Sequence, residues 1–409
     1  MTTRPFFAAT TAILLAASAA WAECPADATG SVRILANDFP ALQAIADRAK
    51  ACVTPTLEVT ANLTTQHTDL QVPALTANPA EYTVKFGANG SITALLTAGL
   101  LRPLDDLVAK YGQDLQPSQL IRIDGKVMAV AMMVNAQHLM YREDILKELG
   151  IAVPTTWDEV LAAAEKIKAS GKVQYPLGGT FKAGWDLAQD FNNMFLGFGG
   201  SFVKPDNMPS VNGEAGVKAL EMMKRLTAYM DPEYLVSESA YVQKQFQQGK
   251  IAMANLWASR AAALDDAKES QVVGKIAMAA APAAVKGGKP ATTLWWDGIV
   301  IARNITDAEA VAAFRVAMEG MDEQMGKANN DAAVWLIKGF VPGRLAKGAI
   351  ASAMAGAPNY ASTVAMGLIH NAISEKAADF LTGKRSAQET LADIEASYLV
   401  KAREQGLVK

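Results

Sequence analysis

The side chains in this sequence that could do chemistry favour binding over catalysis. None of the three histidines lies in an HExxH motif or beside the partners of a catalytic triad. The FLGFGG string at 195–200 is close to a nucleotide-binding loop, but it follows a helical pattern instead of a first strand. The acidic residues fall mostly on polar helix faces, so the pattern nominates no glycosidase carboxylate pair. We therefore expect a protein that is not an enzyme, with no cofactor and no bound metal.

Tryptophans supply the clearest binding chemistry. A flat aromatic face suits the C–H face of a sugar ring, and nearby amides and carboxylates can meet the sugar hydroxyls. The candidates are Trp185, Trp257, Trp295 and Trp296. Trp295 and Trp296 are adjacent in a predicted strand, so their side chains point oppositely and at most one of them faces a ligand directly. Each tryptophan could instead fill a core, which is what we expect for Trp157 on its helix stripe.

The length and composition indicate a globular protein with two lobes. The chain has 409 residues, which exceeds what a single hydrophobic core usually serves. Hydrophobic residues make up 51% and charged residues 19%, as in ordinary globular domains. The net charge is −3 and no basic stripe is present, so we expect no nucleic-acid partner.

Alternating strands and helices predict the α/β class. Strands are expected at 31–36, 56–61 and 82–86, with a helix beginning at Pro40 after the first of them. This rhythm is typical of a doubly wound, mostly parallel sheet. Ligands of such sheets gather at the carboxyl ends of the strands.

The remaining binding candidates stand after predicted strands or on the same helix faces as the tryptophans. They are Asp38, Phe39, Gln66, Lys85, Phe86, Asn89, Asp186, Gln189, Arg260, Asp297 and Arg344. For the two arginines the alternative is a salt bridge between the lobes or a solvated surface charge.

The N-terminal residues have the pattern of a secretory signal peptide. Arg4 supplies the positive charge, residues 6–17 the apolar run, and Ala20-Trp21-Ala22 the small-x-small cleavage site. We predict that residues 1–22 are the signal peptide and that the mature chain starts near Glu23. The residues before Cys24 lack the small side chains of a lipoprotein signal, so no lipid anchor is expected.

Two cysteines are present, Cys24 and Cys52. In an oxidising compartment an even count favours a disulfide, which would tie the mature N-terminus to the end of the first helix. The alternative is a pair of free buried thiols.

Four strings resemble one protein family. The longest is HLMYREDILKELGIAVPTTWDEVLAAAEKI at 138–167, in which Gly150 ends one helix and Thr156 with Glu159 forms the capping box of the next. The others are GLLRPLD at 99–105, QFQQGKIAM at 245–253 and FLTGKRSAQETL at 380–391. Together they resemble bacterial extracellular solute-binding proteins of the sugar-binding type, relatives of maltose-binding protein and substrate-binding components of ABC transporters.

The resemblance implies two α/β lobes joined by three crossings, near Val134, Ala291 and Phe340, with a ligand cleft between them. On this basis lobe 1 comprises residues 23–134 and 291–340. Lobe 2 comprises residues 135–290 and 341–409.

One stretch departs from the family. Many members carry an aspartate just after the third strand, whereas this chain reads EYTVKFG at 81–87. If Lys85 lies in the cleft, it adds positive charge that, with Arg260 and Arg344, would favour a sugar acid or a phosphorylated polyol. Lys85 could equally lie outside the cleft, and the sequence leaves both open.

The function implied by the resemblance is capture of a carbohydrate or polyol in the periplasm for delivery to the membrane permease of an ABC importer. We expect a monomer. We also expect Trp257 and the Trp295–Trp296 pair to grip the ligand from opposite walls, so that removing Trp257 weakens binding without lowering stability. The rival interpretations are an extracellular carbohydrate-active enzyme, a receptor for a metal or polyamine, and a purely sensory binding protein.

Overall fold

The structure is a computed structural model that describes residues 24, 25 and 27–409. The predicted signal peptide at 1–22 lies outside the described residues.

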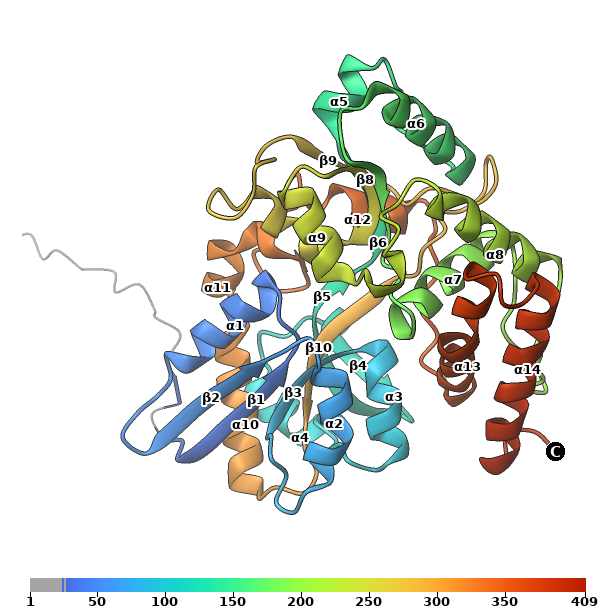
Figure 1. The fold of residues 1–409 in the computed structure, drawn as a ribbon. Coiled ribbons are helices and arrows are strands. Elements are labelled where there is room, and N and C mark those ends of the chain that lie inside the picture. The colour runs from blue at the N-terminus through green and yellow to red at the C-terminus, as the bar shows by residue number, and fades with distance from the viewer. Residues whose placement is uncertain (1–23, 26) are drawn as a thin grey trace, which may run out of the picture.

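The larger of two sheets forms the body that we call lobe 1 (Figure 1). Its strand order is β11-β5-β10-β3-β1-β2, with β4 paired to β5. Its strands are β1 (Gly30–Ala36), β2 (Leu57–Leu63), β3 (Val84–Ala88), β4 (Leu120–Ile123), β5 (Lys126–Asn135), β10 (Trp295–Ile301) and β11 (Val334–Trp335). The helices of this lobe are α1 (Pro40–Lys50), α2 (His67–Thr76), α3 (Asn89–Thr97), α4 (Asp105–Tyr111), α10 (Asp307–Gly320) and α11 (Glu323–Ala328).

The smaller sheet forms lobe 2, with strand order β7-β8-β6-β9. Its strands are β6 (Gln137–Arg142), β7 (Tyr175–Gly178), β8 (Ile251–Trp257) and β9 (Ile276–Ala279). Its helices are α5 (Glu143–Glu148), α6 (Trp157–Ser170), α7 (Trp185–Gly197), α8 (Glu214–Thr227), α9 (Ser239–Gln247), α12 (Lys347–Met354), α13 (Val364–Leu381) and α14 (Ala387–Glu404). The predicted two-lobed α/β class is confirmed.

The chain passes between the sheets at three places, as predicted. β5 is separated from β6 by Ala136 alone, and the chain returns between β9 and β10 and leaves again between β11 and α12. At the first crossing Asn135 donates from Nδ2 to Ser259 Oγ at 3.2 Å, and its Oδ1 accepts from the backbone N–H of Ala136 at 3.1 Å. The side chain of Asn135 therefore holds the backbone where the two lobes meet.

The prediction of mostly parallel sheets is wrong. Only β1–β2, β1–β3 and β7–β8 are parallel among the described strand pairs. β10 runs antiparallel to both of its neighbours, β3 and β5. The cause is the crossing topology: β5 leaves lobe 1 while β10 returns to it from the other lobe, so the two enter the sheet from opposite ends.

Local signals set the helix boundaries that the sequence predicts. Thr156 Oγ1 accepts from the N–H of Glu159 at 3.2 Å, and the Glu159 carboxylate accepts from the N–H of Thr156 at 3.3 Å, which confirms the capping box of α6. Gly171 ends that helix with a φ of +64°, a conformation that residues with a Cβ rarely adopt. The same reciprocal cap, from Thr306 and Glu309, begins α10.

Each lobe has its own apolar core. One core gathers buried residues from 28–133 and 299–337 around the larger sheet, and β5 is buried along nearly its whole length. The others lie in lobe 2 and include Trp157 on α6, in the core as expected. We propose the boundaries 134/135, 290/291 and 340/341 for the lobes because the separate cores change over close to these positions.

A disulfide joins Cys24 to Cys52, as predicted, with Cα atoms 5.1 Å apart. Cys52 is almost fully buried just beyond the end of α1. The bridge closes a loop that contains β1 and α1.

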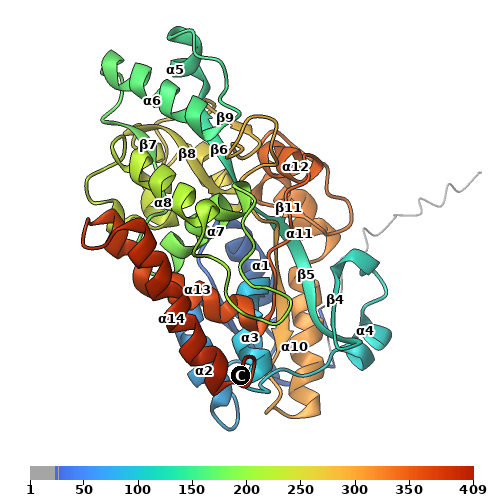
Figure 2. The same ribbon diagram turned by 90° about the vertical axis from the view of Figure 1, so that its right-hand side faces the viewer.

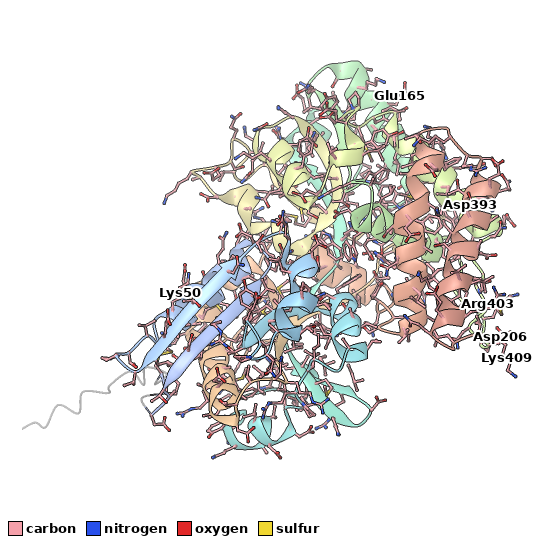
Figure 3. All side chains as sticks on the ribbon, turned by 60° about the horizontal axis from the view of Figure 1, so that its bottom comes forward. Lys50, Glu165, Asp206, Asp393, Arg403 and Lys409 are labelled. Atoms are coloured by element: carbon pink, nitrogen blue, oxygen red, sulfur yellow. A yellow bond between two sulfur atoms is a disulfide. The ribbon has the colours of Figure 1, made fainter. Side chains whose placement is uncertain are left out.

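The C-terminal helices pack side by side on the outside of lobe 2 (Figure 1). Buried Tyr398 on α14 donates from its hydroxyl to the carbonyl of Asn207 at 2.8 Å, and Arg403 Nε donates to the carbonyl of Lys409 at 3.3 Å. Figure 3 accordingly shows Arg403 and Lys409 together with Asp206 at one end of α14. None of the helices in the described part of the chain is both long and apolar enough to cross a bilayer.

Candidate ligand-binding cleft

A cavity of about 750 Å³ lies between the two lobes. Lobe 1 lines it with the loop after β1, the start of α2, one face of α3 and Asp297, and Asn135 lines it from the first crossing itself. Lobe 2 lines it with the start of α7, the residues around the start of α9, the end of β8 and one face of α13. This volume lies within the range of small-molecule sites in proteins.

Three tryptophans form one continuous wall of the cavity. The ring centroid of Trp295 is 5.6 Å from those of both Trp185 and Trp257, which are 6.4 Å from each other. Tyr360 extends the wall, with its ring centroid 4.0 Å from that of Trp295. Trp185 remains 44% exposed, whereas Trp257 and Trp295 are 8% and 4% exposed. Trp185 therefore offers the largest free aromatic face to a ligand.

The expected grip from opposite walls is wrong, because Trp257 and Trp295 contact each other on the same side of the cavity. Trp295 lines the cavity and Trp296 does not; Trp296 packs against the core of lobe 1. Adjacent strand residues point to opposite faces. That rule predicts one tryptophan on each side, and the structure shows which one faces the cavity.

A buried hydrogen-bond network holds Trp295 from behind. Its indole Nε1 donates to Thr293 Oγ1 at 2.8 Å, and that oxygen also accepts from Gln189 Nε2 at 3.0 Å. The Thr293 hydroxyl in turn donates to Asn193 Oδ1 at 3.0 Å. Because all these groups are buried, their bonds fix the orientation of the indole ring.

Asp190 anchors the far end of this network. Its carboxylate accepts from Thr180 Oγ1 and from Gln137 Nε2, and Gln137 Oε1 accepts from Asn193 Nδ2 at 2.5 Å. Burial raises the pKa of Asp190 to about 8, although the bonds from Thr180 and Gln137 oppose that shift. The folded protein therefore keeps this carboxyl largely protonated at neutral pH.

The free energy of unfolding of an Asp190→Asn variant, relative to that of the wild type, should be higher at about pH 7.5 than at about pH 5.5. Because burial raises the pKa of Asp190 in the folded state above the ordinary aspartate value of about 3.9, the folded state holds the proton at pH values where the unfolded state has lost it. Wild-type stability then falls as the pH rises from about 4 towards 8, by at most about 1.4 kcal/mol per unit from this group. Asparagine does not titrate, so urea unfolding should give free energies that diverge by at most about 2.7 kcal/mol over this interval. Parallel pH profiles for the two proteins would show that Asp190 does not titrate in this way.

The lobe 1 side of the cavity holds a buried lysine and a half-buried aspartate. Lys85 is 1% exposed beneath the cavity surface and donates from Nζ to Ser91 Oγ at 3.1 Å. Burial lowers the pKa of Lys85 to about 7, opposed by the negative charge of Asp297. Burial likewise raises the pKa of Asp297 to about 7, opposed by Lys85. Asp297 lines the cavity, and its Oδ2 has no hydrogen-bond partner among the described residues.

Charged side chains gather at one end of the cavity. Arg260 is 8% exposed; its Nη1 donates to the carbonyl of Asp38 at 3.2 Å, and its guanidinium carbon lies 5.8 Å from the Phe39 ring centroid. Nearby, Lys182 pairs with Glu238 at 3.3 Å. Burial raises the pKa of Asp186 to about 7, opposed by Lys182 and Arg260. We call this region, lined by Lys182, Asp186, Glu238 and Arg260, the charged end.

Several polar groups at the cavity keep buried atoms without a partner among the described residues. These atoms are His67 Nδ1, Gln71 Oε1 and His370 Nε2, in addition to Asp297 Oδ2. Burial lowers the pKa of His67 to about 3 and that of His370 to about 4, so both rings are neutral at physiological pH. Unpaired buried polar atoms carry a free-energy cost that hydrogen bonds to a ligand can remove.

The predicted site residues divide into two groups. The cavity lining brings together Phe39, Trp185, Asp186, Trp257, Arg260, Trp295 and Asp297. The others do not line it: Asp38 and Gln66 are exposed on the surface, Phe86 lies in the lobe 1 core, Lys85 and Gln189 lie behind the walls, and Trp296 faces away. Asn89, also outside the lining, bridges the lobes by donating to the carbonyl of Tyr360 at 3.4 Å.

Arg344 is far from its predicted role. It forms an ion pair with Asp265 and donates from Nη1 to the carbonyl of Ile276 at 2.8 Å, within lobe 2. Of the two alternatives that the sequence left for this arginine, the lobe–lobe bridge is wrong, whereas a solvated surface charge describes it, because Arg344 is exposed and pairs with Asp265 on lobe 2.

Much of the cavity lining was not among the predicted site residues. The unforeseen residues include His67, Gln71, Asn135, Glu238, Ser259, Tyr360 and His370. The segment after β2 was a recognisable strand end, so His67 could have been nominated along with Gln66. No sequence signal marks Tyr360 or His370, because α13 reaches the cavity only through the packing of the C-terminal hairpin.

The lobes touch on both sides of the cavity. Arg260 reaches Asp38 at one end, and Asn89 reaches Tyr360 at the other. At the start of α3, a Cβ on Gly90 would lie 2.6 Å from the Trp295 ring, so only glycine allows this close approach. In the described part of the chain, no group of three or more His, Cys, Asp or Glu side chains could hold a metal ion.

The sequence also matches a known family. The family model described as bacterial extracellular solute-binding protein matches residues 36–325, more than half of the chain. The chain belongs to this family. Among relatives of this solute-binding protein, one from Deinococcus radiodurans named "Probable ABC transporter-binding protein" is 33% identical over 214 residues, 50% of each chain. One from Rhizobium meliloti named "Probable sugar-binding periplasmic protein" is 29% identical over 145 residues, 33% of this chain and 34% of the relative. The matched part of this solute-binding protein thus covers half or less of the length of these relatives.

Solved structures share the fold over nearly the whole length. A ribitol complex of an ABC transporter solute-binding protein from Agrobacterium radiobacter is 22% identical with a TM-score of 0.75, covering 90% of this chain and 98% of that one. The maltose-bound MalE3 protein of T. maritima is 18% identical with a TM-score of 0.78, covering 90% and 99%. A D-mannitol complex from Agrobacterium vitis is 19% identical with a TM-score of 0.76, covering 92% and 99%. These likenesses establish the two-lobed fold of the solute-binding protein.

Proposed function

We propose that this solute-binding protein captures a neutral carbohydrate or polyol in its interlobe cavity and delivers it, in the periplasm, to the membrane permease of an ABC importer. The observation that carries this proposal is the pairing of an aromatic wall with unpartnered polar atoms around the same cavity. Trp185 offers a flat face for C–H groups, while Asp297, Gln71 and His370 offer hydrogen-bonding atoms for hydroxyls. The ribitol, maltose and D-mannitol held by proteins of the same fold are consistent with this chemistry.

The charges favour a neutral solute over an anionic one. Four acidic side chains line the cavity, namely Asp69, Asp186, Glu238 and Asp297, against the two cations Lys182 and Arg260. Burial raises the pKa of Asp186 and of Asp297 to about 7, so these two carry about half a negative charge each at neutral pH, and the negative charge still exceeds the positive. Both cations already have partners, because Lys182 pairs with Glu238 and Arg260 bonds to Asp38 and Gln243. A sugar acid or phosphorylated polyol would therefore meet more negative than positive charge.

A thermal-shift screen tests the proposal. A ligand that binds only the folded state raises the melting temperature, by an amount that grows with its concentration over its Kd. Sugars and polyols should raise it, while sugar acids, sugar phosphates and polyamines should not. We further propose that binding is not followed by chemistry, so mass spectrometry should recover the bound solute unchanged. A melting temperature that rises only with anionic solutes or polyamines would contradict the proposal.

Trp185→Ala should weaken solute binding while leaving the unliganded protein nearly as stable as the wild type. Stacking on an aromatic side chain contributes about 1–3 kcal/mol, which corresponds to a roughly five- to 150-fold loss of affinity. Stability should change little because Trp185 is 44% exposed at the start of α7. Titration calorimetry measures the affinity of the best solute from the screen, and a melting curve without ligand is the control. If the affinity were unchanged, Trp185 would not contact the solute.

A further inference from the structure

The stretch EYTVKFG, in which this chain departs from its family, places a lysine beneath the lobe 1 side of the cavity. Lys85 is 1% exposed and does not line the cavity, and its Nζ donates to Ser91 Oγ at 3.1 Å. Ser91 stands in the first turn of α3, which packs against α2, β3 and β10 (Figure 2). The Lys85 ammonium lies too deep to touch a solute, so any part it has in binding acts through a neighbouring side chain.

The path of the Lys85 side chain leads to Asp297. A Cβ on Gly87 would collide with the Lys85 ammonium, so the side chain runs over Gly87 towards the end of β3. Ser91 Oγ, which accepts from Lys85, also accepts from the backbone N–H of Ala88 at 3.0 Å. Ala88 is the residue opposite Asp297 in the pairing of β3 with β10. The ammonium therefore lies close to the strand position that carries Asp297.

Asp297 is a cavity residue on which this charge can act. It lines the cavity, is half-buried, and keeps Oδ2 without a hydrogen-bond partner among the described residues. In the carboxylate form both of its oxygens accept hydrogen bonds, and bonds to an ionised group are roughly twice as strong as those between neutral groups. The protonation state of Asp297 therefore sets how strongly it holds the hydroxyls of a solute.

The elements packed around Asp297 bring Lys85 as the charge that acts on it. Burial favours the protonated form of Asp297, and the positive charge of Lys85 raises the share of the carboxylate form. On α2, His67 is neutral and Asp69 is exposed, and α3 has no ionisable side chain. On β5, Lys126 stands at the far end of the strand, and each ionisable side chain of α10 forms an ion pair elsewhere in lobe 1. The residues of the charged end belong to lobe 2.

We propose that Lys85 is a positioning residue that holds Asp297 as a carboxylate, the form in which Asp297 accepts hydrogen bonds from solute hydroxyls. This inference rests on the proposed function and adds to it a residue that sets the affinity without touching the solute. Since each of the two charges stabilises the other, a solute that bonds to the carboxylate also favours the ammonium beside it. The charge of Lys85 thus serves Asp297, and does not attract an anionic solute.

The affinity of the wild type should rise with pH. The apparent affinity is proportional to the fraction of Asp297 that is ionised before binding, and the pKa of Asp297 is about 7. Titration calorimetry should therefore show binding about tenfold or more weaker at about pH 5.5 than at about pH 8. The probes are the neutral solutes of the thermal-shift screen, among them ribitol, D-mannitol, D-glucose and maltose, and the tightest of them is titrated.

Lys85→Met should move this rise in affinity to higher pH. Methionine is a long unbranched side chain without a charge, so it fills the buried channel and leaves Asp297 without its cation. Because an opposite charge lowers the pKa of a carboxyl by about one unit or more, the variant should bind roughly fivefold more weakly at pH 7. The loss should shrink once the pH is high enough to ionise Asp297 in both proteins. Lys85→Gln serves the same purpose if melting curves show that Lys85→Met does not fold.

The control is the same substitution in an Asp297→Asn background. Asp186 also lines the cavity, and burial raises its pKa to about 7, so part of the wild-type pH dependence can come from Asp186. Asp297→Asn should bind more weakly and keep only that part. Adding Lys85→Met to Asp297→Asn should not move the profile further, because the group that Lys85 acts on is gone.

Two outcomes would overturn the inference and leave the proposed function standing. One is a loss of affinity in Lys85→Met that is the same at every pH, which would mean that Lys85 only fills space. The other is a wild-type pH profile in Asp297→Asn. If no sugar or polyol of the screen binds at any pH, the proposed function fails, and the inference fails with it.

Discussion

Replacing Trp257 by alanine should lower the free energy of unfolding by about 3–5 kcal/mol. Trp257 ends β8, whose residues are all buried, and its 8% exposed ring packs into the core of lobe 2. Its removal leaves a cavity beneath Trp185 and Trp295, which both contact it. Urea unfolding of the unliganded protein measures the loss. This expectation replaces the one from sequence, in which Trp257 was a binding residue without a structural role.

The matched control for Trp257→Ala is Trp185→Ala, which removes the same side chain from the exposed part of the same wall. The two variants should separate stability from binding: the first unfolds earlier, and the second keeps its stability but binds more weakly. If Trp257→Ala unfolded at the same urea concentration as the wild type, Trp257 would not stabilise the core of lobe 2, and this prediction would be wrong.

Removing the disulfide should cost about 3.6 kcal/mol of unfolding free energy in the chain-entropy model, using the 28-residue separation of Cys24 and Cys52. The bridge closes a loop around β1 and α1, so without it the unfolded chain gains conformational freedom. The double variant Cys24→Ala/Cys52→Ala should therefore melt several degrees below the wild type. Dithiothreitol should lower the melting temperature of the wild type towards that of the double variant and leave the double variant unchanged. A reductant effect of equal size on both proteins would show that the bridge does not stabilise the fold.

Local signals account for the part of the fold that the sequence predicts. Helix caps depend on residues only a few positions apart, so the sequence predicts them. Examples are the capping box of Thr156 with Glu159 and the positive φ of Gly171 at the two ends of α6. The direction of β10 depends on the return of the chain from another lobe, and no local pattern records it.

The candidate site was partly predictable for a similar reason. Phe39 follows the carboxyl end of β1, where the strand-end rule applies, and it lines the cavity. Asp297 lies near the amino end of β10 and reaches the same edge of the sheet because β10 is antiparallel to β3, with Asp297 opposite Ala88. Arg344 shows the limit of the rule, because its charge is engaged by Asp265 within the same lobe. His370 is placed by the packing of α13 on α7, and Tyr360 by the bond from its backbone N–H to the carbonyl of Leu294 at 2.9 Å. Both depend on contacts between residues far apart in the chain. Their place in the cavity emerges only in three dimensions.

The position of Gln405 has a practical consequence for purification. Gln405 lines the cavity, and the last residues turn back along α14 so that Lys409 accepts a bond from Arg403. An affinity tag fused after Lys409 would begin four residues after this lining residue, close enough to compete with a solute for the cavity. Pro25, beside the disulfide, lines a separate hollow against α4 and α10 instead. A cleavable tag placed ahead of Glu23, the predicted start of the mature chain, should therefore leave the cavity free.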